Sequence, residues 1–229
     1  MKIILEAIVG SQAYGLANEN SDIDKLAIYV APTQKILSLH KPQETIVHVD
    51  PDMTTHEVEK FIRLASKCNP TVLELLFLDN YETLTDEGQA LILIRKAFLN
   101  NTIKNSYGGY AISQARKLNI RAYTDNELNK PLKDVTRGFS AKTSNRPFKH
   151  ARHCFRLLQQ GKQLLETGDL NVRVDNKDEL MALQDLTIGE VVEKFEEEFK
   201  EFNEIKSILS NEPDYSIINN TLLKIRAMN

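Results

Sequence analysis

Gly10-Ser11-Gln12-Ala13-Tyr14-Gly15, followed closely by Ser21-Asp22-Ile23-Asp24, is the stretch that decides the fold. An apolar run from Ile3 to Val9 precedes it, and a run rich in β-forming residues, Lys25 to Val30, follows it. Short apolar runs that end at glycine or polar residues are typical of buried strands. The sequence therefore predicts two neighbouring strands that are joined by a short Gly-Ser loop.

The composition of this loop suits a phosphate group. Gly10 allows the backbone to approach a bulky anion, and successive backbone N–H groups can form an anion-binding nest. The hydroxyl of Ser11 adds one more donor. The alternative is an ordinary turn, because Gly-Ser pairs also occur in turns that bind nothing.

The two aspartates after the loop suit a divalent cation. Side chains alternate along a strand, so Asp22 and Asp24 are expected on one side, with Ile23 pointing into the core. Two close carboxylates repel each other unless a cation lies between them, and Mg²⁺ is held by one or two carboxylates plus substrate phosphates. The alternative is a solvated strand end. Together with the loop, the pair predicts phosphoryl or nucleotidyl transfer.

In this order and at this spacing, the two motifs resemble the DNA polymerase beta-like nucleotidyltransferase superfamily. Its signature is Gly-Ser, a short helical turn, and Asp-x-Asp on the next strand. Within it, Ala13-Tyr14-Gly15-Leu16-Ala17 and Ser21 to Asp24 resemble the RNA-ligase-associated (RlaP) group, and Lys25 stands where that group often carries arginine. The resemblance implies an α+β fold: a small mixed-sheet catalytic core followed by an all-helical C-terminal lobe.

The superfamily supplies a third carboxylate on a later strand, which shares a metal and acts as general base toward the attacking oxygen. Asp50 and Asp52 both follow the β-rich segment 45–49 with the same parity. The RlaP-like pattern favours Asp52, and Asp50 stays the alternative. A third interpretation is that Asp52 only caps a helix beginning near Thr54. The positions that match the RlaP-like pattern are Asp52, Lys60-Phe61, Asn69-Pro70 and Glu74.

The resemblance also implies a reaction. Gly10 and Ser11 would hold the triphosphate of a nucleoside triphosphate, while Asp22, Asp24 and Asp52 would hold two Mg²⁺ ions, with Mn²⁺ as the alternative metal. The nucleotide would pass to a hydroxyl or phosphate of an acceptor, with release of pyrophosphate. The expected acceptor is a nucleic acid end, above all RNA, with a small molecule or a protein as alternatives. For Glu74, a structural hydrogen bond to a neighbouring loop is expected rather than catalysis.

Composition excludes several classes of protein. The chain has 229 residues, a net charge of −3, 41% hydrophobic residues and 27% charged residues, unlike a disordered or membrane protein. Cys68 and Cys154 lie far apart without a CxxC pattern, which indicates reduced thiols. The apolar run near the N-terminus is short and contains Glu6, so we interpret it as a strand of a cytoplasmic protein rather than a signal peptide.

Helical patterns fill most of the chain beyond the third strand. A capping box at Thr54 and Glu57 predicts a helix through Ala65, and Asn69-Pro70 and Thr85-Asp86 open two more. A polar hinge at 100–102 places a boundary between a catalytic core, 1–100, and a helical substrate-binding lobe, 101–229. The helices expected in that lobe cover 110–118, 147–165, 178–183, 188–209 and 216–226, with one uncertain strand at 172–174.

Residues 130–156 contain eight basic residues and one acidic residue, so the segment attracts phosphate despite the negative total. Lys149, His153 and Arg156 share a helix face, and this run also resembles the second lobe of the RlaP group. We therefore expect Lys149 and Arg156 to bind the triphosphate or the acceptor. The alternative is a solvated face whose positive charge offsets the negative charge of the acidic helix expected over residues 190–204. The pair His150 and His153 lacks the further ligands of a zinc site.

Two other functions stay open. One is a module of the same fold that has lost turnover and binds a nucleotide or RNA through the basic segment. The other is a regulator that adenylylates a protein. Minimal members of the superfamily with that activity lack a large second lobe, so the helices beyond residue 100 count against it.

Overall fold

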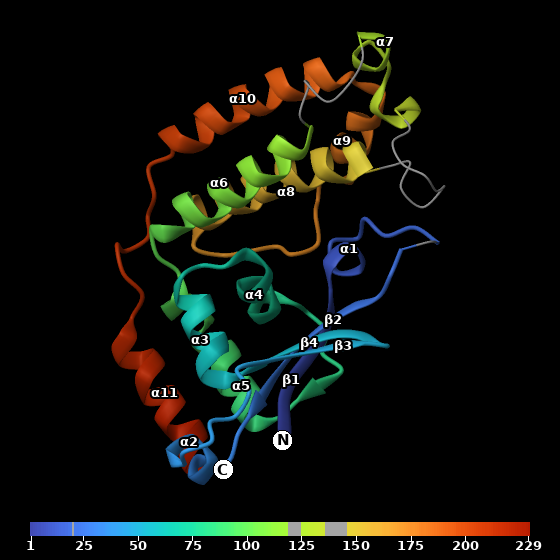
Figure 1. Ribbon diagram of the computed structural model, residues 1–229. Helices are drawn as coiled ribbons and strands as arrows, with labels where there is room; N and C mark the ends of the chain where they lie inside the picture. The colour runs from blue at the N-terminus through green and yellow to red at the C-terminus, as the bar shows by residue number, and fades with distance from the viewer. Residues whose placement is uncertain (20, 119–124, 136–145) are drawn as a thin grey trace. The chain divides into compact units, whose positions relative to one another are not determined.

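A five-stranded mixed sheet forms the centre of the N-terminal part of the chain (Figure 1). The strand order is β3-β4-β2-β1-β5, in which β2 and β4 are parallel and the other neighbours antiparallel. The computed structural model describes residues 1–19, 21–118, 125–135 and 146–229. The strands are β1 Lys2–Val9, β2 Asp24–Val30, β3 Thr45–Val49, β4 Asp52–Glu57 and β5 Thr83–Leu84. The predicted α+β class, a mixed sheet followed by a helical region, is confirmed.

Helices in two compact units complete the fold. The first unit comprises Met1–Thr102, Gly168–Val174 and Leu209–Asn229, and the second comprises Ile103–Thr167 and Asp175–Ile208. The chain thus returns twice to the unit that holds the sheet. The predicted domains, 1–100 and 101–229, stay a prediction. Helices of the first unit are α1 Gly10–Ala13, α2 Thr33–Leu37, α3 Val58–Ser66, α4 Pro70–Glu74, α5 Asp86–Leu93 and α11 Tyr215–Ala227.

The second unit is helical in its described residues, with an aromatic core. Phe155 of α8 meets Phe195 of α10 edge to face, with ring centroids 6.2 Å apart. Gly161 allows α8 and α10 to approach each other closely, because a Cβ at this position would lie 2.9 Å from the ring of Phe202. The helices are α6 Thr102–Ala115, α7 Asp125–Leu128, α8 Arg146–Thr167, α9 Lys177–Ala182 and α10 Ile188–Glu204. No described helix combines the length and the apolar character needed to cross a membrane.

Local capping signals were reliable where no strand competed for the residues. The side chain of Asn69 accepts from Val72 N and opens α4, and that of Thr85 accepts from Gly88 N and opens α5. Gly168, with φ +64, follows the end of α8. The helix expected over 188–209 ends at Glu204, where Lys104 Nζ donates to the carbonyls of Asn203 and Ile205.

The helix predicted through Ala65 is present as α3, but its predicted start at a Thr54–Glu57 capping box is wrong. Residues 52–57 form β4, and α3 begins at Val58 with Glu57 as its N-cap. Parallel pairing with β2 satisfies the backbone hydrogen-bonding groups of residues 52–57. This pairing outweighs the local sequence preference for a helix. Asp52 consequently opens a strand and caps no helix. Residues 172–174, the uncertain strand, form none, and the short strand β5 was missed because two residues carry no periodicity.

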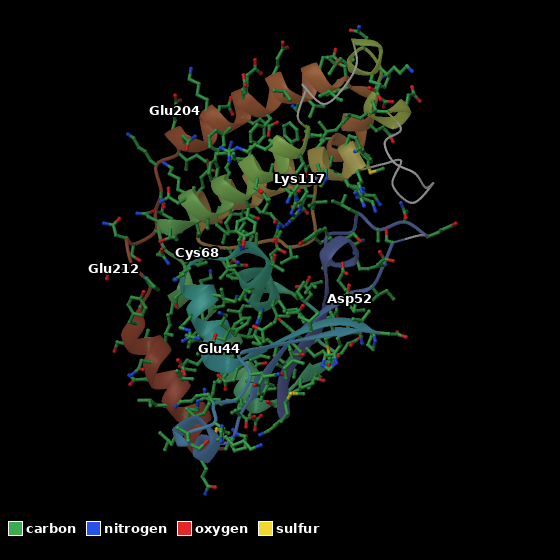
Figure 2. All side chains as sticks on the ribbon, viewed as in Figure 1. Glu44, Asp52, Cys68, Lys117, Glu204 and Glu212 are labelled. Atoms are coloured by element: carbon green, nitrogen blue, oxygen red, sulfur yellow. The ribbon has the colours of Figure 1, made fainter. Side chains whose placement is uncertain are left out.

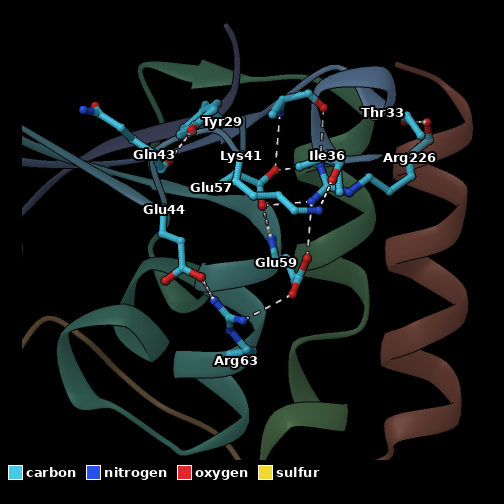
Figure 3. A network of polar contacts seen from close by, with 11 residues as sticks. Tyr29, Thr33, Ile36, Lys41, Gln43, Glu44, Glu57, Glu59, Arg63 and Arg226 are labelled. Carbon is cyan, nitrogen blue, oxygen red and sulfur yellow. Dashed lines mark hydrogen bonds and ion pairs between the residues drawn. The ribbon is translucent and has the colours of Figure 1, made fainter. Parts of the chain in front are cut away.

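Glu57 instead anchors the C-terminal helix to the sheet (Figure 3). Arg226 of α11 donates to both carboxylate oxygens of Glu57, at 2.6 and 2.9 Å. The carboxylate also accepts from the backbone N–H groups of Ala31 and Glu59, at 3.3 and 2.8 Å. The Glu57 side chain is 5% exposed and that of Arg226 11%. This bidentate pair closes the first unit across 169 residues of sequence.

A second anchor holds the first strand. Glu87 at the start of α5 forms an ion pair with Lys2 and accepts from Thr85 Oγ1 at 2.7 Å and Asn229 Nδ2 at 3.2 Å. The bond from Lys2 is the largest cause that lowers the pKa of Glu87 to about 2, against burial, which raises it. These partners stabilise the ionised carboxylate in the folded state.

Acid is therefore expected to remove stability that Glu87 supplies. A carboxyl whose pKa is lowered by folding contributes stability above its unfolded pKa, near 4.5, which is lost as pH falls toward about 2. Full loss corresponds to about 3 kcal/mol at most. Unfolding free energies of wild type and Glu87→Gln, measured by urea denaturation from pH 7 to pH 2.5, should converge at the acid end. Parallel curves would contradict the assignment.

Candidate active site

The Gly-Ser loop is a single helical turn between two glycines in the left-handed region. Gly10, the first residue of α1, has φ +69, and Gly15, two residues beyond the end of α1, has φ +73. The loop is closed by Tyr14 N–H to Gly10 O at 3.1 Å and Leu16 N–H to Ser11 O at 3.0 Å. A Cβ on Gly10 would lie 2.8 Å from Asp24 Oδ2. Glycine is therefore required at position 10 both by the backbone and by the neighbouring carboxylate.

Strand register brings two of the three aspartates together. Val9 pairs with Asp24 across β1 and β2, and the parallel register of Lys25 with Met53 places Asp24 beside Asp52. Both aspartates are the first residues of their strands (Figure 2 labels Asp52). Asp24 is partly buried, whereas Asp22 and Asp52 are exposed. The arrangement places carboxylates at one end of the sheet, next to the loop.

The charges of this group act on one another. Burial raises the pKa of Asp24 above its usual range, and the negative charges of Asp52 and then Asp22 raise it further. Ionised Asp24 thus experiences repulsion that a bound cation would relieve. Asp50 lies two residues before Asp52, in the turn between β3 and β4. The geometry therefore favours Asp52 over Asp50 as the neighbour of Asp24.

The carboxylates fit a magnesium ion by their chemistry, but they do not form a complete ligand set. Among the residues that the structure describes, no three His, Cys, Asp or Glu side chains are grouped closely enough to hold a metal ion. Mg²⁺ is commonly bound through one or two carboxylates and the substrate phosphates, so a full protein cage is not required. Asp24 with Asp52 or Asp22 is such a partial set.

The expectation that Ile23 points into the core is wrong. Ile23 is 53% exposed, because β2 begins only at Asp24 and residues 21–23 lie in the preceding loop. Strand alternation therefore does not relate Asp22 to Asp24, and their proximity comes from the path of the loop. Lys25, on the strand itself, pairs with Glu82 at 2.5 Å and Glu6 at 3.7 Å.

A buried carboxylate holds the Gly-Ser loop through a hydrogen bond. Glu74, at the end of α4, is 2% exposed, and Tyr14 Oη donates to its Oε2 at 2.7 Å. The expected structural hydrogen bond from Glu74 to a neighbouring loop is thus confirmed. The Asn69-Pro70 start of α4 sets the turn that presents Glu74 to the loop.

Loss of this bond is expected to loosen the loop. Tyr14→Phe leaves Glu74 buried with one donor fewer, which should lower the free energy of unfolding by about 1–3 kcal/mol. Hydrogen exchange of the amides of residues 10–16 should accelerate about tenfold or more, the factor equivalent to about 1.4 kcal/mol. Tyr215→Phe, at a tyrosine that is 58% exposed, is the matched control and should change neither measurement. Unchanged exchange in Tyr14→Phe would refute the role.

Sequence reasoning missed a second support of the loop. The segment 168–174, here called the strap, returns from α8 to the first unit. Val174 N–H donates to Tyr14 O at 3.2 Å, and a Cβ on Gly15 would lie 3.3 Å from Nε of Arg173. Arg173 is exposed and was missed because an isolated arginine far along the chain carries no local signal. Only the tertiary contact identifies it.

The two predicted phosphate-binding residues of the basic segment lie on α8 in the second unit. Lys149 is exposed. Arg156 is 1% exposed, donates to Gln160 Oε1 and lies 3.0 Å from Nδ1 of His153. Burial, and next the charge of Arg156, lower the pKa of His153 to about 3, so this histidine is neutral at pH 7. Phosphate binding by Lys149 and Arg156 stays a prediction, and Arg137 and Lys142 lie outside the described residues.

Two comparisons with known proteins found similar sequences. A family model described as "RlaP: RNA repair pathway DNA polymerase beta family" matches residues 1–222. A relative from Bacillus subtilis (strain 168), "Uncharacterized protein YcgL", is 31% identical over 128 residues. That match covers 54% of this chain and 47% of the relative, so it spans about half the length of the curated protein.

Proposed function

Because the chain belongs to the RlaP family, described as an RNA repair pathway DNA polymerase beta family, we propose that it is a nucleotidyltransferase. It transfers a nucleoside monophosphate from a Mg²⁺-bound nucleoside triphosphate to a hydroxyl or phosphate of an acceptor and releases pyrophosphate. The observation that carries this proposal is the carboxylate of Asp24. It lies against Gly10 and has its pKa raised by burial and by the charges of Asp52 and Asp22.

Each residue has a role in this scheme. Backbone N–H groups around Gly10 and the hydroxyl of Ser11 bind the triphosphate. Asp22, Asp24 and Asp52 would hold the metal, which offsets negative charge on the phosphates and favours ionisation of the attacking hydroxyl. Asp52 accepts the proton of that hydroxyl. A bond then forms from the acceptor oxygen to the α-phosphorus, and the bond from this phosphorus to the bridging oxygen breaks.

We propose an RNA end as the acceptor. The family description, which names an RNA repair pathway, supports this choice, and the match over residues 1–222 includes the helical region. The excess of positive charge in residues 130–156 suits a polyanion. Lys149 is exposed and can therefore reach a phosphate from solvent. Arg156 is buried, so it would influence the phosphate-binding side chains of α8 indirectly, through its contacts with His153 and Gln160.

One observation favours a second candidate function, that of a nucleotide-binding or RNA-binding module without turnover. The described residues contain no group of three metal-ligating side chains placed to hold an ion. An assay separates the two functions. The full chain is incubated with Mg²⁺, nucleoside triphosphates labelled at the α-phosphate, and a panel of RNA, DNA and small alcohols. Label transfer that Asp22→Ala abolishes supports the enzyme, whereas RNA binding without transfer supports the module.

The third carboxylate can be identified in the same assay. Asp52→Asn should lower turnover about 10²- to 10⁴-fold, the range for loss of a general base. Asp50→Asn removes the same charge two residues earlier, in the turn, and should leave turnover within about threefold of wild type. The reverse pattern would move the role to Asp50. Equal, small losses in both variants would remove the third carboxylate from the mechanism.

A further inference from the structure

A cavity of about 320 Å³ lies in the first unit beside α1, the helical turn that begins at Gly10. Its walls come from four separate segments: the end of β1 at Ile8, α1, residues 77–82, and the strap. Its volume lies near the lower end of the range of small-molecule sites, about 300–1,000 Å³. None of Gly10, Ser11, Asp22, Asp24 and Asp52 lines it. The cavity is therefore separate from the proposed site of reaction.

Strand register places this cavity on the other face of the sheet. Ile8, a lining residue, pairs with Lys25, while its neighbour Val9 pairs with Asp24. Successive side chains point to opposite faces, so Ile8 and Lys25 face away from Asp24. Glu82, also in the wall, bonds Lys25 Nζ at 2.5 Å and so belongs to the same face. A molecule in the cavity lies away from the carboxylate that would take part in transfer.

The lining combines the groups that recognise a nucleobase. Phe77 and Val172 are buried apolar residues of the wall, and one face of the Phe77 ring carries the guanidinium of Arg95, 5.0 Å from the ring centre. Gln12 and Asn80 bring two side-chain amides, each with a donor and an acceptor that match the edge of a heterocycle. An apolar wall with few polar groups is the usual composition of small-molecule sites.

The charges of the lining limit how anionic a ligand can be. Arg173 supplies a guanidinium, the group best shaped to bind a phosphate. Glu82 is compensated by Lys25, but Asp79 adds a negative charge to the same wall. A triphosphate would meet this repulsion without further cations from the lining, whereas one phosphate can pair with Arg173.

We propose that this cavity binds a nucleoside monophosphate, with the base between the apolar wall and the amides of Gln12 and Asn80 and the phosphate on Arg173. The bound molecule is not the reacting nucleotide. It lies against the loop, because Arg173 also packs on Gly15, and Gln12 belongs to α1. Binding itself does not depend on the proposed transfer reaction. Only its coupling to turnover rests on that function, and such coupling would be reciprocal between the two ligands.

Calorimetry with adenosine 5′-monophosphate as the probe tests the site. The full chain is titrated in EDTA, so that metal-dependent binding at the aspartates is removed. Arg173→Gln should weaken binding at least tenfold, and adenosine, which lacks the phosphate, should bind wild type and Arg173→Gln equally. Val172→Phe should also weaken binding by filling the cavity, with thermal unfolding as the check of its fold. Asp24→Asn is the matched control and should bind within twofold of wild type.

Several results would overturn the proposal. No binding to wild type at millimolar probe, or equal affinity of wild type and Arg173→Gln, would remove the site. Loss of binding in Asp24→Asn with retention in Arg173→Gln would place the probe at the aspartates. Failure of the proposed function is a separate outcome: absence of labelled transfer with intact, Arg173-dependent binding would refute the transfer reaction and leave this cavity assigned.

Discussion

Replacing Asp24 with asparagine is expected to stabilise the protein while it abolishes nucleotidyl transfer. The carboxylate is partly buried beside Gly10, and the charges of Asp52 and Asp22 oppose its ionisation. Removing the charge relieves this repulsion, by a few tenths to about 1 kcal/mol once solvent screening is included. It also removes a proposed metal ligand, so turnover should fall about 10³-fold or more, which corresponds to about 4 kcal/mol of transition-state stabilisation.

The pH dependence of the stability difference follows from the direction of the pKa shift. Folding raises the pKa of Asp24, so its protonated form favours the folded state, and that contribution is lost as pH rises through the folded-state value. The gain in unfolding free energy from Asp24→Asn should therefore be largest near pH 7 and shrink in acid, where aspartic acid and asparagine are both neutral.

Urea denaturation and the labelled-nucleotide assay measure the two effects on the same preparations. Asp50→Asn is the matched control, because it removes an exposed charge from the neighbouring turn. It should change the free energy of unfolding by no more than about 0.5 kcal/mol, as is usual for surface substitutions. An Asp24→Asn protein that is less stable than wild type would show that Asp24 has a structural role. One that retains full turnover would end the proposed mechanism.

The largest loss of stability is expected from Arg226→Ala. Arg226 makes a bidentate bond to Glu57, whose side chain is only 5% exposed (Figure 3). Removal of the guanidinium leaves a buried carboxylate without its cation, and such losses amount to about 3–5 kcal/mol. The backbone N–H groups of Ala31 and Glu59 still donate to Glu57 in this variant, so we expect a loss near the lower end of that range. Urea denaturation at pH 7 measures the difference.

Two further variants separate the ion pair from helix packing. Lys224→Ala, two positions earlier on α11 and exposed, should cost less than about 0.5 kcal/mol. Combining Glu57→Gln with Arg226→Met removes both charges and should recover most of the stability, because no buried charge is left uncompensated. If the double variant is as unstable as Arg226→Ala, the loss comes from the hydrogen bonds of Arg226 to Glu57 and Ala31 rather than from an uncompensated charge on Glu57.

Features governed by neighbouring residues could be predicted well. The Gly-Ser loop, the strands on either side of it, and the helix starts at Asn69-Pro70 and Thr85 all depend on contacts within a few positions. The hydrogen bond from the loop to Glu74 was also expected, because a carboxylate among leucines needs a partner when it is buried. The same local reasoning failed at residues 52–57, where the capping pattern was overridden by pairing with β2.

By itself, therefore, the sequence determined the class of the fold and the place of the Gly-Ser loop between two strands, because the motifs involved are written in adjacent residues. Phosphate binding by the loop and metal binding by Asp22 and Asp24 stay predictions. The tertiary structure alone decided that Asp52 opens a strand beside Asp24, that Arg226 closes on Glu57, and that Arg173 packs against Gly15. These contacts join residues that are 28 or more positions apart, and their energy comes from strand pairing, burial and charge between segments. No local pattern of residues encodes them.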